Sequence, residues 1–326
     1  NKFSSSYQNQ IVNAIKLFFK IVKDSKIEID KIHRPKREKT LPNVLSKEEV
    51  LKIIDATENL KHKTSLEKFP IDFDKYKIKF DLLQEEIKSG NSYLCNLTAK
   101  TKIKTSITLD EIYDLVQSKF KLRFQNESDN FVCFSPERFI EIKENKIFTY
   151  PMKGTIDASI PNAKEIILND IKEMAEHTMV VDLLRNDLGI IANNVRVDKF
   201  RYVEKINAGD KKLLQVSSQI SANLQNDWNK KIGDIITSLL PAGSITGTPK
   251  RKTVEILEKL EDYNRDFYTG IFGVFDGEKL DSSVMIRFIE EDIDKNKFYK
   301  SGGGITCDSD VLNEYQELLD KIYLPF

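Results

Sequence analysis

The chain has 326 residues, of which 40% are apolar, and its 51 Lys and Arg residues balance its 51 Asp and Glu residues. A net charge of zero argues against a dedicated surface for nucleic acids or anionic membranes, which shows a basic excess. Three widely separated cysteines without a CxxC motif, no run of about 18 apolar residues and no signal-peptide pattern predict a soluble cytoplasmic protein, and argue against a disulfide framework, a zinc site or a membrane span.

The first part of the chain, up to about residue 70, is rich in lysine and carries helical patterns. Ile11, Ile15 and Phe18 lie on one apolar stripe, and Ser46 with Glu49 forms a capping box at the start of a second helix. The segment between them, KIHRPKREKTLPN, is polar and contains prolines, which is typical of a linker. We therefore expect a lysine-rich helical region over residues 1–70 and a larger domain over residues 71–326.

From about residue 70, predicted helices alternate with segments that are typical of antiparallel strands. There is no regular βαβ alternation, so the order predicts an α+β fold with large antiparallel sheets. The stretch FVCFSPERFIEIKENKIFTYPM is a hairpin candidate with Glu144, Asn145 and Lys146 at its turn. If that turn centres on Asn145, Glu137 and Lys153 face each other with their Cβ atoms ~5 Å apart.

Two interpretations of this Glu–Lys pair stay open. It could be an exposed cross-strand ion pair, which contributes less than ~1 kcal/mol to stability. Alternatively, Glu137 is an acid–base carboxylate beside a nucleophilic amine of Lys153, where Pro151 and Gly154 bracket the end of the strand.

A long helix is predicted from about Ala163 to Leu188. Its first apolar stripe is formed by Ile167, Ile171, Met174 and Thr178. Glu176 lies on the opposite side and heads a second stripe, which continues with Met179, Val180 and Leu183. Because a buried carboxylate needs a cation, a donor or a proton, Glu176 either pairs with a nearby Lys or Arg or belongs to a functional site.

The last predicted helix, from about Asp310 to Tyr323, carries a possible complement to Glu176. Its core stripe is formed by Val311, Tyr315, Leu318 and Ile322. Glu314, Glu317 and Lys321 share the adjacent face. Together with Glu176, the two glutamates would suit an all-oxygen Mg²⁺ site, although a Glu-x-x-Glu pair on a helix is by itself usually solvated.

Two glycine-containing segments resemble anion-binding loops. PAGSITGTPK places Thr248 and Pro249 as the cap and first turn of a helix that runs to about Leu260, yet it does not match a Walker A motif. SGGGITCDSD contains a glycine run that lets a ligand approach the backbone closely. Arg287, in the otherwise apolar strand SSVMIRFIE, could bind a carboxylate through its guanidinium group. These residues predict an enzyme for a small acidic substrate that uses Mg²⁺, with a covalent lysine step as one option.

Six segments of the chain together resemble the chorismate-using enzymes. In chain order they are SPERF, PMKGT, AEHTMVVDLLRNDLG, LPAGSITGTPK, MIRF and SGGGITCDSDVLNEYQELLDK, within residues 75–326. The resemblance implies two large antiparallel β-sheets packed face to face and flanked by helices, with the active site between them. Residues 71–326 would then be a chorismate-binding catalytic domain.

Lys153 distinguishes between branches of this family. Anthranilate synthases and isochorismate synthases typically carry alanine in the corresponding position, whereas lysine is characteristic of aminodeoxychorismate synthase component I, a transferase of folate and p-aminobenzoate biosynthesis. Isochorismate synthases have a water-activating lysine where this chain has Leu94. The alternatives that stay open are an anthranilate synthase component I in which Lys153 is a tolerated variant, and a binding or regulatory subunit without activity.

The resemblance also implies roles for individual residues. Glu176 and Glu317 would hold Mg²⁺, with Glu314 near the ion or bound to it through water. Lys153 would attack ring carbon 2 of chorismate, Glu137 would protonate the hydroxyl that leaves carbon 4, and ammonia would enter at carbon 4. Burial or the cation would lower the pKa of Lys153 so that its amine is neutral. The implied carboxylate-binding groups are Arg287, Tyr268, Lys321 and the N–H groups of Gly302, Gly303 and Gly304, and those lining the ring are Gly154, Thr155 and Ser244.

The chain departs from the family pattern at two points, and it also lacks a glutaminase. Many relatives have a histidine where this chain has Gln215, which we expect only to hydrogen-bond the substrate. The amino-terminal lobe is reduced and shows no counterpart of the part that binds tryptophan in anthranilate synthases. No cysteine lies in a glycine-flanked nucleophile turn, so we expect ammonia to come from solution or from a separate glutamine amidotransferase subunit.

Overall fold

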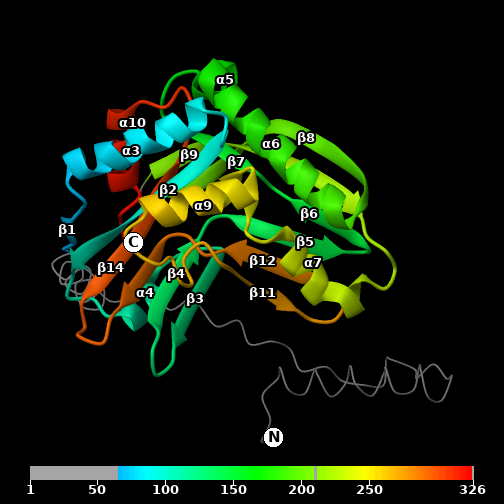
Figure 1. Ribbon diagram of the computed structural model, residues 1–326. Coiled ribbons are helices and arrows are strands. Elements are labelled where there is room, and N and C mark those ends of the chain that lie inside the picture. Colours follow the sequence, from blue (N-terminus) through cyan, green and yellow to red (C-terminus); the bar gives the residue numbers. More distant parts are fainter. Residues whose placement is uncertain (1–64, 209–210, 325–326) are drawn as a thin grey trace, which may run out of the picture. The chain divides into compact units, whose positions relative to one another are not determined.

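The computed structural model describes residues 65–208 and 211–324, which belong to one compact unit (Figure 1). The predicted helical region over residues 1–70 falls almost entirely outside the described residues and stays a prediction. None of the described helices is long and apolar enough to cross a membrane.

The described strands form two sheets, and every pairing between neighbours is antiparallel. The strands of the first sheet are β1 (Glu67–Phe69), β2 (Leu94–Lys104), β3 (Phe120–Gln125), β4 (Asn130–Ser135), β10 (Gly247–Thr248), β13 (Phe288–Glu291) and β14 (Lys297–Ile305). Their order is β1-β2-β14-β13-β4-β3, with β10 also paired to β2.

The second sheet is built from the other strands of the described chain. They are β5 (Arg138–Lys143), β6 (Lys146–Thr149), β7 (Met152–Asp157), β8 (Asn193–Ala208), β9 (Lys211–Asn223), β11 (Ile271–Phe275) and β12 (Leu280–Val284). Their order is β11-β12-β5-β6-β9-β7, with β8 on the other edge of β9.

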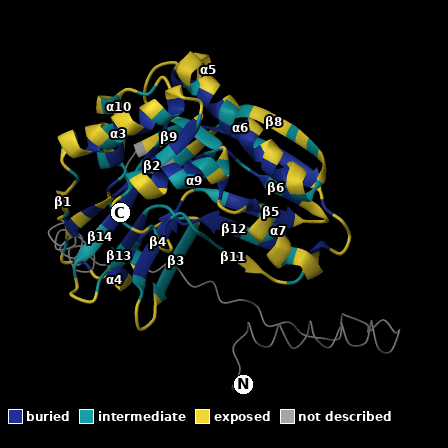
Figure 2. Cartoon of the chain, viewed as in Figure 1, coloured by how far each residue is buried: buried dark blue, intermediate teal, exposed yellow. Residues whose placement is uncertain are grey.

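Helices pack on both sheets. They are α3 (Phe73–Lys88), α4 (Leu109–Leu115), α5 (Ala163–Asn169), α6 (Ile171–Ile191), α7 (Ile232–Leu239) with the 3-10 turn η2 (Trp228–Lys231) before it, α8 (Gly243–Thr246), α9 (Lys250–Leu260) and α10 (Val311–Asp320). Figure 2 shows the pattern: the strands are mostly buried, whereas the helices expose one face. The α+β architecture with two large antiparallel sheets is confirmed.

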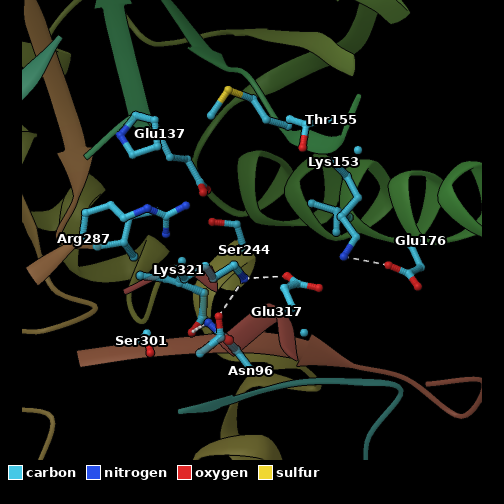
Figure 3. A pocket seen from close by; sticks show the side chains of 18 of the residues that line it. Asn96, Glu137, Lys153, Thr155, Glu176, Ser244, Arg287, Ser301, Glu317 and Lys321 are labelled. Carbon is cyan, nitrogen blue, oxygen red and sulfur yellow. Dashed lines mark hydrogen bonds and ion pairs between the residues drawn. The ribbon is translucent and has the colours of Figure 1, made fainter. Parts of the chain in front are cut away.

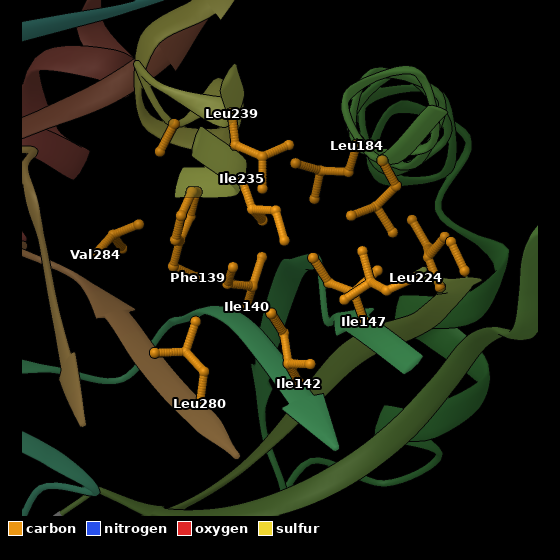
Figure 4. Close-up of a cluster of buried hydrophobic side chains, with 14 of the residues drawn as sticks. Phe139, Ile140, Ile142, Ile147, Leu184, Leu224, Ile235, Leu239, Leu280 and Val284 are labelled. Carbon is orange, nitrogen blue, oxygen red and sulfur yellow. The ribbon is translucent and has the colours of Figure 1, made fainter. Parts of the chain in front are cut away.

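Separate apolar clusters attach the helices to the sheets. Under α6 and α7, the cluster of Figure 4 includes Phe139, Ile140, Ile142, Ile147, Leu184, Leu224, Ile235, Leu239, Leu280 and Val284. A second cluster packs α3, α9 and α10 on β2 and β14, with Leu83, Leu97 and Leu318 fully buried. Burial of each such side chain contributes roughly 1.5–3 kcal/mol, so these helices are held mainly by their apolar faces.

The chain passes from one sheet to the other at two neighbouring places. Residues 136 and 137 connect β4 of the first sheet to β5 of the second, and residues 285–287 connect β12 of the second sheet to β13 of the first. The predicted continuous strand SSVMIRFIE is therefore wrong, because it is two strands in different sheets. The hairpin prediction also fails for its first half, since β4 and β5 do not lie in one sheet.

The predicted facing of Glu137 and Lys153 is wrong as well. The hairpin between β5 and β6 has a two-residue turn, Glu144–Asn145, in which both residues have positive φ angles of 51° and 58°. Its register therefore pairs Ile142 with Ile147, one residue away from the predicted register, and such a slip reverses the face of every later side chain. Moreover, β7 pairs with β9 instead of β5.

The predicted long helix is interrupted at Asp170. The Asp170 side chain accepts a hydrogen bond from the Glu173 amide at 2.9 Å, so it caps a new helix, α6. The first predicted stripe is wrong as a result, because Ile167 is buried whereas Ile171 is 76% exposed. The second stripe is confirmed, since Glu176 is buried in line with Val180 and Leu183.

Candidate active site

A pocket of about 610 Å³ lies between the two sheets, beside α6 and α10. Both sheets contribute to its lining, through β2 and β14 of the first and β7 and β9 of the second. Figure 3 shows its charged side chains gathered around the opening. The predicted site residues that line it are Glu137, Lys153, Gly154, Thr155, Glu176, Gln215, Ser244, Tyr268, Arg287, Gly302, Gly304, Glu317 and Lys321.

Lys153 enters the pocket from an irregular part of β7. The register between β7 and β9 shifts between Met152 and Thr155, and Gly154 has a φ of 90° that other residues rarely adopt. The Lys153 Nζ atom lies 2.7 Å from a carboxylate oxygen of Glu176, as Figure 3 shows. Glu176 therefore pairs with a lysine, as one of the two interpretations predicted. Because Lys153 and Glu176 line the same pocket, the pair can also belong to a functional site.

The ion pair determines the protonation of Lys153. Burial disfavours the charged amine, but the neighbouring Glu176, with Glu317 and Glu173 farther away, raises the pKa of Lys153 above its ordinary value. The lowering of this pKa that was expected from burial is therefore wrong, because the ion pair with Glu176 favours the charged amine.

Glu173 is a pocket residue that the sequence analysis missed. It lies one turn before Glu176 on α6, and a Cβ atom at Gly154 would lie 3.0 Å from its Oε2 atom. This oxygen is buried without a hydrogen-bond partner, and burial raises the pKa of the carboxyl group. The spacing could have identified it, because Glu173 and Glu176 repeat the Glu-x-x-Glu pattern of Glu314 and Glu317.

The helix α10 supplies the second pair of carboxylates. Glu317 forms an ion pair with Lys321 at 2.6 Å, and this neighbour outweighs burial and lowers the pKa of Glu317. Glu314 lies behind the pocket lining, where its Oε1 accepts a hydrogen bond from Ser309 at 2.8 Å. Its Oε2 is buried without a partner, and burial raises its pKa.

The glycine run that was predicted as a loop is part of strand β14. The Gly302 carbonyl accepts a hydrogen bond from Lys321 Nζ at 2.7 Å, so the peptide groups of Gly302 point away from β2 and into the pocket. Since alternate residues of a strand point the same way, the N–H of Gly304 also faces the pocket. Gly303 points toward β2, and the prediction that its N–H faces the substrate is wrong. Its missing side chain leaves space for Glu314, whose Oε2 would lie 3.3 Å from a Cβ there.

Glu137 and Arg287 occupy the two places where the chain changes sheets. Arg287 adopts a positive φ of 54°, and its Nε atom lies 3.4 Å from the Tyr323 hydroxyl. Burial raises the pKa of Glu137, and a hydrogen bond with Ser244 and the charges of Arg287 and Lys321 oppose this only in part. Glu137 therefore tends to keep its proton, as a general acid requires.

The segment PAGSITGTPK contributes to the pocket lining through α8. The helix that was predicted to bind anions does not contribute. Ser244 and Ile245 line the pocket. Thr248 is not the predicted cap, because it belongs to β10, and the N-terminal Lys250 of α9 forms an ion pair with Asp187 at 2.8 Å. Thr248, Pro249 and Lys250 are not among the residues that line the pocket.

The carboxylates of α6 and α10 fit a hard cation in their chemistry. Within residues 65–208 and 211–324, no three acidic, His or Cys side chains converge as a ready metal cluster, and Glu176 and Glu317 each form an ion pair with a lysine. Nevertheless, all four carboxylates offer oxygen ligands, and Glu173 and Glu314 each keep a buried oxygen without a partner. Such a donor set suits Mg²⁺.

Comparisons with known proteins identify the family of the chain. A family model described as chorismate binding enzyme matches residues 17–325. An uncharacterized PabA-like protein of Pasteurella multocida is 50% identical over 260 residues, which cover 80% of this chain and 79% of the relative. Aminodeoxychorismate synthase component 1 of Bacillus subtilis is 32% identical over 267 residues, or 78% of this chain, and the chain spans about half (55%) of that relative's length. Anthranilate synthase component I of Streptococcus pneumoniae shares the fold, with a TM-score of 0.69 and 23% identity over 91% of this chain and 69% of that chain.

Proposed function

The chain belongs to the family of chorismate-binding enzymes, and on this premise we propose that it converts chorismate to 4-amino-4-deoxychorismate through a covalent bond to Lys153. This activity would make it an aminodeoxychorismate synthase component I, which serves p-aminobenzoate and folate biosynthesis. The proposal is carried by one observation. The Lys153 amine and the Glu137 carboxyl group, whose pKa burial raises, line the same pocket.

The proposed reaction has two steps. First, Lys153 Nζ bonds to ring carbon 2, the ring double bonds shift, and the bond from carbon 4 to its hydroxyl breaks while Glu137 gives its proton, so that water leaves. Second, ammonia bonds to carbon 4, the double bonds shift back, and the bond from carbon 2 to Lys153 breaks. Glu137, now a carboxylate, takes a proton from the incoming nitrogen.

The pKa shift of Glu137 favours this reaction, whereas that of Lys153 opposes it. Burial raises the pKa of Glu137, which favours the acid form needed in the first step. Lys153 must be neutral to attack, yet Glu176 raises its pKa. The ion pair between Lys153 and Glu176 must therefore open, and the amine must lose a proton, before the covalent step.

The acidic residues of α6 and α10 are the proposed Mg²⁺ site. Glu176 and Glu317 would hold the ion directly, and Glu173 and Glu314 lie one turn away from them with free oxygens. When bound, Mg²⁺ would attract electrons from the ring carboxylate and make carbon 2 more susceptible to attack.

The remaining lining residues are suited to a dicarboxylate with a ring. Arg287 and Lys321 supply positive charge, and the N–H groups of Gly302 and Gly304 supply donors. Tyr268 is buried at the pocket wall. Gly154, Thr155 and Ser244 would contact the ring, and Gln215, which pairs with Thr155 across β7 and β9, would hydrogen-bond the substrate.

We propose that a separate glutamine amidotransferase supplies the ammonia. Two of the three thiols are poorly suited to attack glutamine, because Cys95 and Cys133 are buried and burial raises the pKa of both. For Cys95 the pKa rises to about 12. The third, Cys307, is exposed, and its neighbours in the sequence do not form a glycine-flanked nucleophile turn.

The deciding experiment incubates the purified chain with chorismate, Mg²⁺ and ammonium, and identifies the product by mass and fluorescence. The proposal expects a non-fluorescent product with the mass of aminodeoxychorismate. Fluorescent anthranilate would show an anthranilate synthase component I instead. Binding of chorismate without turnover would indicate a binding or regulatory subunit.

A further inference from the structure

Lys300 lines the active-site pocket, but the proposed reaction does not use its amine. It lies on β14, two residues before Gly302, and its side chain is 0% exposed. Lysine is almost never fully buried unless its charge is paired. The groups that its amine contacts therefore indicate what this residue does.

A carboxylate and two carbonyl groups satisfy the Lys300 amine. The Nζ atom forms an ion pair with Glu290 of the neighbouring strand β13 at 2.7 Å. It also donates to the backbone carbonyls of Arg265 at 3.0 Å and Asn264 at 3.4 Å. The carboxylate of Asp266 adds a longer contact of 3.5 Å. Three consecutive residues, which lie between α9 and β11, therefore converge on one buried amine.

One of these carbonyls belongs to the turn that places Tyr268 in the pocket wall. The Arg265 carbonyl accepts a second hydrogen bond, from the backbone N–H of Tyr268, at 2.9 Å. Lys300 therefore binds the acceptor of the hydrogen bond that closes a four-residue turn. Tyr268 is 3% exposed and lines the pocket, where it is one of the proposed carboxylate-binding groups.

The same segment is bonded to the crossing between the sheets that ends at Arg287. The N–H of Thr269 donates to the Met285 carbonyl at 2.9 Å, and the N–H of Met285 donates to the carbonyl that follows Thr269 at 2.8 Å. Beyond Arg287, Phe288 pairs with Lys300 across β13 and β14, and the Lys300 Nζ atom lies 5.6 Å from the centre of its ring. Lys300 is thus linked to both sides of Arg287.

The backbone around these contacts is strained. Asp266 and Thr269 have positive φ angles of 50° and 66°, and Arg287 has one of 54°. None of the three is a glycine, and a β-branched residue such as threonine rarely adopts this conformation. Such conformations persist only where the surrounding structure holds them. The amine of Lys300 supplies contacts of this kind.

We propose that Lys300 is a positioning residue whose buried amine holds the strained segment 264–269 against β13 and β14, and thereby keeps Tyr268 and Arg287 in place to bind the substrate. The effect on substrate rests on the proposed function, in which these two residues bind the carboxylates of chorismate. The order of the segment itself can be measured without substrate.

The test replaces Lys300 by methionine, which is apolar and of similar length but cannot donate a hydrogen bond. Glu290 keeps an ion pair in this variant, because Lys100 lies 2.7 Å from its other oxygen. Lys100→Met is the matched control. It removes the second lysine of the same carboxylate, which pairs with Lys300 from β2, and it lies outside the pocket lining.

The first measurement is hydrogen exchange in the protein without substrate, read by mass spectrometry on peptides that cover residues 264–270. In Lys300→Met these amides should exchange about tenfold faster or more, while residues 193–208 of β8 keep the parental rate. In the enzyme assay KM for chorismate should rise by roughly 5- to 50-fold with kcat lowered by less than about threefold, because a lost binding contact raises KM. Lys100→Met should change each of these quantities by less than about twofold.

Several results would overturn the inference. One is parental exchange over residues 264–270 together with a parental KM in Lys300→Met. Another is a Lys100→Met enzyme that changes as much as Lys300→Met, because the effect would then come from the shared Glu290. Faster exchange in every peptide with KM unchanged would show that Lys300 only stabilises the fold.

Two further outcomes keep the test decisive. If Lys300→Met does not fold, the shorter amide of Lys300→Gln takes its place, and parental exchange and KM in that variant contradict the proposal. A parent chain that forms no aminated product refutes the proposed function, while the exchange rates still decide whether Lys300 holds the segment.

Discussion

Replacement of Lys153 is the sharpest test of the proposed chemistry, because the ion pair and the nucleophile can be separated. In Lys153→Ala both are lost. In Lys153→Arg the charge beside Glu176 remains, but a guanidinium group stays protonated and cannot attack carbon 2. We expect both variants to lose the 4-amino product and the covalent adduct. A nucleophile-free Lys153→Ala enzyme also leaves carbon 2 open to ammonia, so a small amount of 2-amino product or anthranilate is expected from it.

The structure sets the size of the effect on stability. The Lys153–Glu176 contact of 2.7 Å joins side chains that are 26% and 8% exposed, so it lies between a surface ion pair and a buried one. Surface pairs contribute up to ~1 kcal/mol, whereas breaking a buried pair costs ~3–5 kcal/mol. Lys172, at 3.7 Å, still faces Glu176 in the variant. We therefore expect Lys153→Ala to reduce the free energy of unfolding by about 1–3 kcal/mol, and Lys153→Arg by less.

The sign of the pH dependence follows from the raised pKa of Lys153. The stabilisation that charged Lys153 gives the folded protein is fully present below the ordinary lysine pKa of 10.5. It is lost as the pH rises through the pKa of Lys153 in the folded protein. The difference in unfolding free energy between parent and Lys153→Ala should accordingly shrink in strongly alkaline solution. Denaturant unfolding at several pH values measures it.

Mass spectrometry of the trapped enzyme provides the decisive assay. The peptide that contains PMKGT should carry an adduct of roughly the mass of dehydrated chorismate in the parent and no adduct in either variant. A Lys153→Arg enzyme that makes aminodeoxychorismate at a near-parental rate would refute covalent catalysis. In that case the lysine would be only the partner of Glu176.

The other predictions concern the acid, the metal and the nitrogen source. Glu137→Gln should abolish loss of the carbon 4 hydroxyl while chorismate still binds, and a variant with parental turnover excludes this acid. Because burial raises the pKa of Glu137, the parent should lose activity as the pH rises through that value when the concentration of free NH₃ is held constant. Glu176→Gln and Glu317→Gln should each abolish turnover and weaken Mg²⁺-dependent chorismate binding in calorimetry. Undiminished activity in either variant removes the substituted residue from the metal site. The purified chain should use ammonium, best at alkaline pH where free NH₃ is present, and glutamine only after a partner is added; glutamine-dependent product from the chain alone contradicts the proposed partner.

The sequence predicts the helices of this fold better than it predicts where strands pair. The last helix was predicted from about Asp310 and begins at Val311 with Asp310 as its cap, because apolar spacing and capping are local signals. The end of the helix at Asn169 was missed, although Asp170 followed by Glu173 is a local capping signal. That break determines which stripe of α6 faces the core.

Pairing between strands depends on contacts that lie far apart in the sequence. SSVMIRFIE reads as one apolar strand, yet Ser283 pairs with Arg138 in one sheet and Phe288 pairs with Cys133 in the other. No local pattern distinguishes these cases. The composition of the three glycines predicts a loop, whereas they lie in strand β14. At Gly302 a Cβ atom would lie 2.6 Å from the Leu97 carbonyl oxygen of β2, so the close approach of that strand excludes other residues there.

Most of the predicted site residues line the pocket, but Gly303 and Glu314 do not, Glu173 was missed, and the geometry could not be predicted. Glu137 and Lys153 were expected to meet through one hairpin, whereas they reach the pocket from a crossing between sheets and from an irregular strand. Each therefore depends on tertiary contacts that fix an irregular backbone. Functional groups are often found at such places, where local rules of strand pairing are broken.

The charges of the pocket lead us to expect that the proposed substrate binds together with both a proton and a cation. Among the described residues that line it, five carboxylates face four cationic side chains, and these are Glu137, Glu173, Glu176, Glu317 and Asp320 against Lys153, Arg287, Lys300 and Lys321. Full ionisation leaves one negative charge, and chorismate, a dicarboxylate, would add two more. A proton on Glu137 removes one of the three, and a divalent cation balances the other two. Since uncompensated charge in a partly buried site is costly, substrate binding should strengthen with Mg²⁺ and weaken as the pH rises and Glu137 loses its proton, which calorimetry at several pH values with and without Mg²⁺ can measure. Chorismate binding that is independent of both Mg²⁺ and pH would contradict this assignment of charges.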